Sequence, residues 1–315
     1  MSTPGKRIKI LKDNAIAGIY KIPCFNQADR VEFFSLSTDQ EKELEKLRSL
    51  KSKAMFVLQL GYFKARRMFF VFDLEEVQDD SDFVVRNIFH SEVNLSGTIT
   101  KPTRLTQQRR ILDLFNYRLC TGEDRSRLYK KACALAPIGA NPSFIFEELV
   151  SFLEREQIVL PGYSILQNII GKALVYESNR LESNLTKLLD PHEKERLADL
   201  LKAEETLYQL TLLKREPKDF SFKEMGQEKD RLELLRPSYE LSVKVLSKLD
   251  LSNENITRYA SLVGYYTVYK LKRLKQDTAN LYLLCFVHLR YQKINDHLID
   301  AFIYHANKYT TEQNW

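Results

Sequence analysis

The sequence has few residues that break helices and no segment that could span a membrane. Only ten glycines and nine prolines occur among its 315 residues. Long stretches are instead rich in Leu, Lys, Glu, Arg and Tyr, a composition that favours helices. The most apolar stretch, residues 281–289, is far shorter than the ~18 residues that cross a bilayer. We therefore expect an all-α protein without a membrane partner.

Motifs for catalysis and for bound cofactors are also missing. The cysteines form no CxxC pair and have no histidine at ligand spacing, so we expect no zinc site; they are Cys24, Cys120, Cys133 and Cys285. Because no signal peptide precedes them, we expect buried free thiols in a reducing cytoplasm. The sequence has neither a GxSxG motif nor a glycine-rich phosphate loop. These absences predict a protein that is not an enzyme and holds no cofactor.

Positive charge is concentrated in two segments. Residues 99–138 contain nine Lys and Arg against three acids, and residues 255–293 contain seven against one. Each segment therefore carries a net charge of +6, which equals that of the whole chain, and the remainder is net −6. Such segregation is typical of a face that binds a polyanion. Ordinary solvated helix faces are the alternative.

Capping residues and a linker predict small helical modules in series. Asn26 and Thr38 can begin short helices, and a longer helix follows over residues 51–67. Residues 68–72 could form a strand or a helix, and the acidic residues 73–82 are expected to form an exposed loop. The Ser-, Thr-, Gly- and Pro-rich residues 94–103 suggest a linker. We expect three modules: an N-terminal one (1–98), a basic one (99–190) and a C-terminal one (191–315).

The first candidate DNA-binding constellation is a predicted helical hairpin over residues 104–136, with its turn at Thr121 and Gly122. Basic side chains project from both helices, and glutamines near the start of the first helix add hydrogen-bonding groups close to backbone N–H groups that can bind phosphate. The candidate residues are Arg104, Gln107, Gln108, Arg109, Arg110, Arg125, Arg127, Lys130 and Lys131. A basic hairpin that binds nothing is the alternative.

The second constellation resembles a helix-turn-helix over residues 141–180. Asn141 and Pro142 begin one helix, the segment IVLPGYS turns the chain, and a long helix starts near Ser164. The start of this helix carries Tyr163, Ser164, Gln167, Asn168 and Lys172. Gln and Asn can contact adenine in the major groove, and Lys can contact a phosphate. We expect Gln167 and Asn168 to be exposed, and a plain helical hairpin is the alternative.

A third constellation mixes tyrosines with basic residues in the segment 258–275. On one continuous helix, Tyr266, Lys270 and Arg273 would share a face. Tyrosines among basic residues suit phosphate contacts and base stacking. An amphipathic core helix with tyrosines at its boundary explains Tyr259 and Tyr265 equally well.

Several of these segments together resemble the N-terminal region of the Tn-three family of replicative transposases. The resemblance is carried by residues 157–174 (QIVLPGYSILQNIIGKAL), 218–225 (KDFSFKEM) and 255–303. Residues 50–70 (LKSKAMFVLQLGYFKARRMFF) resemble the opening domain of those enzymes, which is catalogued as a domain of unknown function. The similar segments occur in the same order over nearly the whole chain.

The resemblance implies a cytoplasmic bacterial protein that binds the terminal inverted repeats of a transposon as double-stranded DNA. Members of this family continue into a ribonuclease-H-like domain with an acidic triad. No triad position can be assigned within the 315 residues, so we expect no strand cleavage. We expect a homodimer or an association with a full-length transposase. The alternative function is a helical scaffold that binds another protein.

Overall fold

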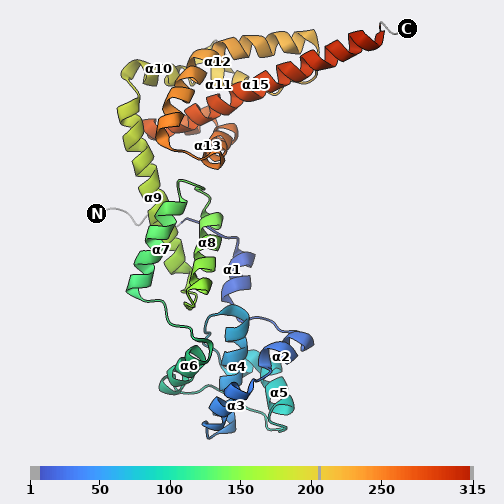
Figure 1. Ribbon diagram of the computed structural model, residues 1–315, viewed down its shortest axis with the longest axis vertical. Coiled ribbons are helices and arrows are strands. Elements are labelled where there is room, and N and C mark those ends of the chain that lie inside the picture. The colour runs from blue at the N-terminus through green and yellow to red at the C-terminus, as the bar shows by residue number, and fades with distance from the viewer. Residues whose placement is uncertain (1–7, 205–206, 313–315) are drawn as a thin grey trace. The chain divides into compact units, whose positions relative to one another are not determined.

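The computed structural model describes residues 8–204 and 207–312 and confirms the all-α expectation. Over these residues the chain forms fifteen α-helices, one short 3-10 helix and an antiparallel hairpin with two residues in each strand (Figure 1). The helices fall into two compact units. Unit 1 combines residues up to 132 with 142–171, and unit 2 combines 133–141 with residues from 172 onwards. Within the described ranges, no helix is long and apolar enough to cross a membrane.

Unit 1 begins with a group of helices around α4 (Leu50–Arg66). Ten consecutive residues of α4, from Ala54 to Phe63, are buried, so the helix is enclosed on all sides and has no solvent-facing stripe over this length. Its neighbours contribute the phenylalanines and aliphatic side chains of the surrounding core. They are α2 (Gln27–Phe34), α3 (Thr38–Glu45), α5 (Gln78–Asn87) and α6 (Lys101–Phe115).

The caps of the short helices follow the sequence closely. Asn26 accepts a hydrogen bond from the backbone N–H of Asp29 and forms the expected capping box of α2. The cap of α3 is Ser37, one residue before the predicted Thr38, because Gln40 rather than Glu41 closes the capping box. In both cases a polar side chain satisfies a backbone N–H that the first helical turn leaves free.

The acidic segment is not the exposed loop that its composition predicted. It forms η1 (Leu74–Val77) and α5, and Asp80 is buried against α2 and α4. The carboxylate of Asp80 lies 2.7 Å from Nε of Arg30 and accepts a hydrogen bond from the Tyr62 hydroxyl at 2.8 Å. Burial raises the pKa of Tyr62, and the neighbouring Asp80 carboxylate raises it further. The preceding residues 68–72 form neither strand nor helix.

The remaining helices of unit 1 are α1 (Asp13–Tyr20), α8 (Pro142–Arg155), most of α7 (Gly122–Leu135) and the start of α9 (Tyr163–Leu188). The helices α8 and α9 begin where the sequence predicted, at Pro142 and one residue before Ser164. Pro142 occupies the first turn of α8, where its missing N–H leaves no hydrogen bond unmade.

Unit 2 is organised around the long helix α15 (Gln276–Glu312), which packs against α12 (Phe222–Leu249) and α13 (Asn253–Tyr265). Its core contains mainly leucines, among them Leu281, Leu283 and Leu284 of α15. The helices are interrupted around Pro217, at residues 214–221. The other elements are α10 (Pro191–Asp199), β1 (Ala203–Glu204), β2 (Leu207–Tyr208), α11 (Gln209–Leu213) and α14 (Val268–Lys272).

A buried asparagine attaches residues 136–140 to α13. Asn255 is fully buried; its Oδ1 accepts from the N–H of Ala140 at 2.6 Å, and its Nδ2 donates to the carbonyls of Ala136 and Pro137 at 3.0 and 2.9 Å. Ser252, which caps α13, also donates to the carbonyl of Ile138. The amide thereby pairs backbone groups that burial would otherwise leave unsatisfied.

The cysteines are free, but most are not buried as expected. Only Cys285 lies in a core, where burial raises the pKa of its thiol to about 12. Cys24 is exposed, and Cys120 and Cys133 are partly exposed. The expectation of four buried thiols was therefore wrong, because three of these cysteines lie outside the tightly packed cores.

α4 packs closely against α2 at Gly61, so we expect Gly61→Ala to destabilise unit 1. An added Cβ would collide with the ring of buried Phe34 and lie 3.2 Å from the carbonyl oxygen of Phe33. Overpacking of this kind costs about 1–3 kcal/mol. The matched control is Gly18→Ala in α1, where no atom lies within 4 Å of the new Cβ and the helix gains up to about 1 kcal/mol. Chemical denaturation measures both; equal stability of the two variants would contradict the packing.

Candidate nucleic-acid interface

The helix α6 presents only some of its predicted DNA-binding residues to solvent. Arg109 is exposed, whereas Arg104 and Gln108 are partly buried. Arg110 lies 3.8 Å from Glu43 of α3. Because α6 packs against α3 and α4, one side of the helix belongs to the core of unit 1, and Arg109 remains the best-placed of its predicted phosphate ligands.

The structure corrects the prediction for Gln107, which is buried and does not belong to the exposed site. Its side chain is 1% exposed; Nε2 donates to the Ser52 carbonyl at 2.8 Å, and Oε1 accepts from Gln59 of α4 at 2.7 Å. All of these partners lie in the interior, so the amide holds α6 on α4 and is not available to DNA. The pattern of basic and amide residues gave no sign of this burial.

The connection between α6 and α7 is anchored at both backbone and side-chain level. The N–H of Arg118 donates to the Gln157 carbonyl, and the Arg118 carbonyl accepts from Val159, both at 2.9 Å. The Arg118 guanidinium donates to Oδ1 of Asp124 at 2.7 Å, and the Thr121 N–H donates to Oδ2 at 2.9 Å. The Arg118 guanidinium contributes most to holding the pKa of buried Asp124 well below its usual range.

This anchor fixes the start of α7, whose basic side chains lie in different environments. Arg127 forms ion pairs with Asp124 and with Glu156, at 2.5 Å from the latter, and its guanidinium covers the ring of Phe152 in α8. Lys131 also lies over Phe152. Arg125 and Lys130 are exposed, and within the described residues neither makes an ion pair with a carboxylate.

The helices α6 and α7 therefore have different principal neighbours, although they follow one another in the chain. Figure 1 shows α6 and α7 apart from each other within unit 1, with α7 beside α8. The break between the helices is longer than the predicted turn at Thr121 and Gly122: α6 ends at Phe115, and Gly122 is already the first residue of α7. The Thr121 hydroxyl accepts a hydrogen bond from the Asp124 N–H in the first turn of α7. The two helices do not form the expected closed hairpin. We call α6, α7 and the connection between them, which Arg118 and Asp124 hold in place, the anchored corner.

The start of α9 is partly covered by the chain's own N-terminal segment. Nε2 of Gln167 donates to the carbonyl of Ile8 at 2.7 Å, so the expectation that Gln167 is exposed was wrong. The hydroxyl of Tyr163 accepts from the N–H groups of Ile10 and Leu11, and its ring packs edge-on against Tyr20. These two predicted readers thus hold residues 8–11 in place.

Three other predicted residues of α9 are exposed. Ser164, Asn168 and Lys172 follow one another at intervals of four residues on the helix, which places them on one face. Lys172 is the first residue of α9 that belongs to unit 2. Of the two amides proposed to read bases, only Asn168 has a solvent-facing side chain in this structure.

The third basic segment is not one continuous helix. The helix α13 ends at Tyr265, and Thr267 caps the separate helix α14, so the expected common face of Tyr266, Lys270 and Arg273 is interrupted. Lys270 and Arg273 are nonetheless exposed. Tyr259 stacks on Tyr282 with ring centroids 5.5 Å apart and is a core-boundary residue.

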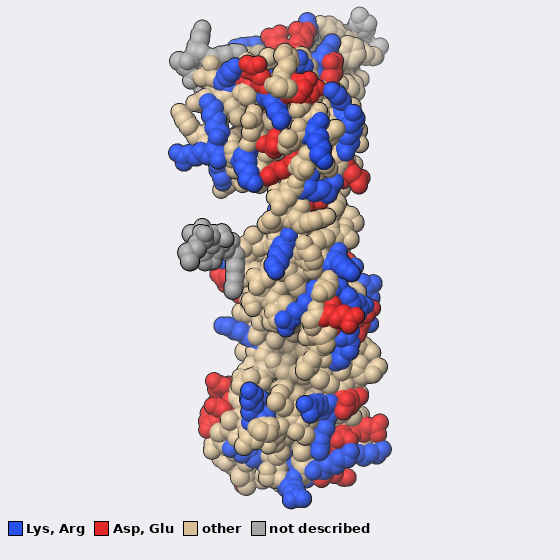
Figure 2. Space-filling model, turned by 90° about the vertical axis from the view of Figure 1, so that its left-hand side faces the viewer, with Lys and Arg blue, Asp and Glu red and all other residues tan. Residues whose placement is uncertain are grey.

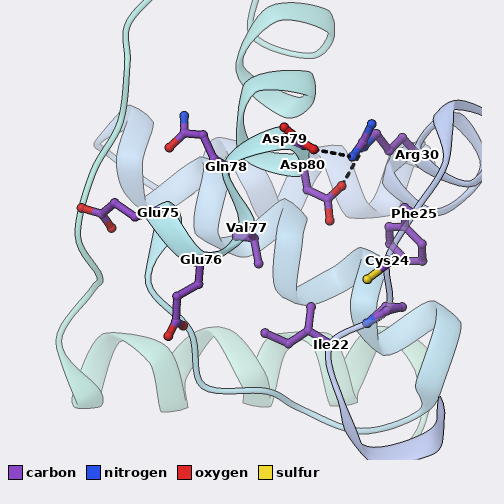
Figure 3. A pocket seen from close by; sticks show the side chains of 11 residues that line it. Ile22, Cys24, Phe25, Arg30, Glu75, Glu76, Val77, Gln78, Asp79 and Asp80 are labelled. Carbon is purple, nitrogen blue, oxygen red and sulfur yellow. Dashed lines mark hydrogen bonds and ion pairs between the residues drawn. The ribbon is translucent and has the colours of Figure 1, made fainter. Parts of the chain in front are cut away.

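A pocket of about 420 Å³ lies in unit 1 beside η1 and the start of α5 (Figure 3). Four of its eleven lining residues are acidic and one is basic. The carboxylates already have partners: Asp79 and Asp80 face Arg30, Glu75 accepts from the Gly97 N–H, and Glu76 accepts from the N–H of Asp73. Such a pocket repels phosphate and is unsuited to DNA. Among the described residues no group of three His, Cys, Asp or Glu side chains could hold a metal ion.

Basic residues are spread over both units. On the face drawn in Figure 2, Lys and Arg side chains alternate with Asp and Glu side chains. A phosphate-binding role therefore depends on individual cations without an acidic partner, because a neighbouring carboxylate weakens the attraction for an anion. Of the predicted site residues on α6 and α7, the exposed cations Arg109, Arg125 and Lys130 meet this condition among the described residues.

Comparison with known families places unit 1 in a defined group. A family model described as "Domain of unknown function (DUF4158)" matches residues 10–173, more than half of the chain. The chain belongs to this family. No curated protein matches the chain. The matched range includes α6, α7, α8 and the start of α9, so the anchored corner lies within the domain that defines the DUF4158 family.

We expect Asp124→Asn to destabilise the DUF4158 domain at neutral pH, because it removes the charge that Arg118 and Thr121 bind. Loss of a charged partner in a buried hydrogen-bonded pair costs about 1–3 kcal/mol. Since the folded pKa of Asp124 is depressed, its contribution is present above the unfolded pKa of ~4 and is lost as pH falls through the folded value. The stability difference between wild type and variant should therefore shrink below about pH 4.

Urea titrations at several pH values test this dependence. The control is Asp113→Asn, which removes an exposed carboxylate of α6 and should change stability by no more than about 0.5 kcal/mol. A difference between wild type and Asp124→Asn that stays constant down to the lowest pH would show that the carboxylate charge does not anchor α7.

Proposed function

We propose that this chain binds double-stranded DNA at the terminal inverted repeats of a transposon, as the DNA-binding part of a Tn-three family transposase and without strand cleavage of its own. The observation that carries the proposal is that three predicted phosphate ligands on α6 and α7, Arg109, Arg125 and Lys130, are exposed and have no acidic partner within the described residues. Phosphate contacts from such side chains supply most of the affinity for DNA. The resemblance of residues 157–174, 218–225 and 255–303 to those transposases names the target.

The anchored corner supports this role energetically. Because Arg118, Asp124 and Thr121 hold the start of α7, Arg125 and Lys130 project from a helix whose position is already set. Binding then requires less ordering of the protein backbone, which increases affinity for a given set of contacts. Base recognition is assigned to the exposed Asn168 on α9, and Ser164 and Lys172 on the same face supply backbone contacts.

A protein-binding scaffold is the second candidate, and one feature of α15 favours it. Near its C-terminal end the helix buries Ile294 and Ala301 on one side, while Ile299, Phe302 and Ile303 are exposed. An exposed apolar face of this kind suits contact with another protein. Salt distinguishes the two functions, because phosphate-driven binding weakens steeply as salt rises whereas apolar docking does not.

The double variant Arg125→Ala with Lys130→Ala should reduce the dependence of DNA affinity on salt. Each phosphate contact that is lost lowers the slope of log K against log salt by about one, and it does so equally for all DNA sequences. The matched control is Lys42→Ala with Lys46→Ala on α3, which removes the same charge from lysines paired with Asp39 and Glu43. Fluorescence anisotropy measures the slopes; equal slopes for the two double variants would remove α7 from the interface.

Asn168→Ala should weaken binding to the inverted repeat by about 1–3 kcal/mol and leave binding to scrambled duplex nearly unchanged, because base contacts supply the difference between them. Gln167→Ala is the informative comparison. It removes the hydrogen bond to Ile8, so it should lower thermal stability without changing the ratio of specific to scrambled affinity. If Asn168→Ala leaves that ratio unchanged in a competition assay, α9 does not read bases.

A further inference from the structure

Unit 2 carries a compact surface group of aromatic and basic side chains, here called the tyrosine patch: Tyr208, Tyr265, Tyr266, Tyr269, Lys270, Lys272 and Arg273. The patch combines β2, the end of α13 and the short helix α14. The Thr267 hydroxyl accepts from the N–H of Lys270 at 3.3 Å and caps α14. The rings of Tyr208 and Tyr269 meet edge to face with centroids 5.9 Å apart. Sequence reasoning missed Tyr208, which lies some sixty residues before the others in the chain.

The tyrosines of the patch are exposed far more than those at the edge of the core. Tyr265 is 84% and Tyr269 66% exposed, whereas Tyr259, on the same helix as Tyr265, stacks on Tyr282 and packs against the core. Packing against the core therefore explains why a tyrosine occupies position 259, but it does not explain the tyrosines at positions 265 and 269. A single exposed aromatic residue is ordinary; two beside a row of cations form a surface with aromatic faces and positive charge together.

The two lysines of the patch are directed at rings rather than at acids. Nζ of Lys270 lies 3.6 Å from the ring centroid of Tyr266, and Nζ of Lys272 lies 4.9 Å from that of Tyr208. Over residues 8–204 and 207–312, no ion pair with a carboxylate involves Lys270, Lys272 or Arg273. Lys214 donates to the Tyr266 carbonyl at 2.7 Å and holds the end of α13. The charge of the three cations thus remains available to an external anion.

We propose that the tyrosine patch binds unpaired nucleotides of DNA, with Tyr265 and Tyr269 stacking on bases and Lys270, Lys272 and Arg273 binding the intervening phosphates. This inference rests on the proposed DNA-binding function and adds a second class of DNA structure to it. A base pair inside a duplex has both faces covered by its neighbours. Aromatic stacking at the protein surface therefore selects bases that are single-stranded or displaced at the end of a duplex.

Binding of a matched pair of DNA probes tests the patch. One probe is a blunt inverted-repeat duplex, and the other is the same duplex with a short single-stranded overhang. The wild-type chain should bind the overhang probe more tightly. Tyr265→Ala with Tyr269→Ala should abolish this advantage, lowering overhang affinity about 5- to 100-fold while blunt-duplex affinity stays the same. Tyr265→Phe with Tyr269→Phe keeps the rings and should retain the advantage, because the hydroxyls are not needed for stacking.

A direct signal for stacking comes from Tyr265→Trp. The chain has one tryptophan, Trp315, so the parent protein supplies the background emission. The new indole should be quenched by the overhang probe but not by heparin, which is a polyanion without bases. Quenching by heparin to the same extent would mean that the patch responds to charge alone and would overturn the stacking proposal.

The outcomes separate this inference from the proposed function. If the wild-type chain binds neither probe at low salt, both are wrong. If it binds both probes equally, or if the alanine variant keeps the overhang advantage, DNA binding stands and the tyrosine patch is not a nucleotide site. If the phenylalanine variant loses the advantage as fully as the alanine variant, the hydroxyls and not the rings are responsible, which also contradicts stacking.

Discussion

The ion pair between Arg118 and Asp124 is the interaction on which the candidate DNA-binding surface of unit 1 depends. Its carboxylate is buried and receives the guanidinium of Arg118 together with the N–H and hydroxyl of Thr121. An unpaired carboxylate at this depth would be strongly unfavourable. The pair therefore determines where the connection from α6 ends and where α7 begins. The exposed positions of Arg125 and Lys130 follow from the helical phase that this anchor sets.

The same requirement, that buried polar groups be paired, divides the amide and tyrosine residues into two sets. Gln107, Gln167 and Tyr163 bind groups of their own chain and hold α6 to α4 or the N-terminal segment to α9. Asn168 and Tyr265 are solvent-facing and leave their polar or aromatic surfaces free for a ligand. Amide and tyrosine side chains thus suit both DNA recognition and contacts between helices. Whether a given side chain is buried or exposed decides which of these two roles it can have.

Local signals explain why most helices could be predicted from the sequence. Asn26, Asp190 and Ser252 each cap the helix that follows, since a cap acts through backbone groups only a few residues away. The acidic residues 73–82 were misassigned because Asp80 becomes a helical core residue through Arg30 and Tyr62, which are distant in the chain. The burial of Gln107 and the cover that residues 8–11 give to α9 are tertiary contacts of the same kind, which local patterns do not encode. Membership in the DUF4158 family was consistent with the resemblance of the opening domain, whereas the assignment of a DNA target stays a prediction.

The central claim is that unpaired cations on α6 and α7 bind the phosphates of inverted-repeat DNA. The most direct test is the equilibrium affinity of the intact wild-type chain for the inverted-repeat duplex and for a scrambled duplex, measured over a series of salt concentrations. The account predicts that both affinities fall linearly in log K against log salt with a steep slope, and that the inverted repeat is bound more tightly throughout. Affinity that does not change with salt, or equal affinity for the two duplexes, would contradict it.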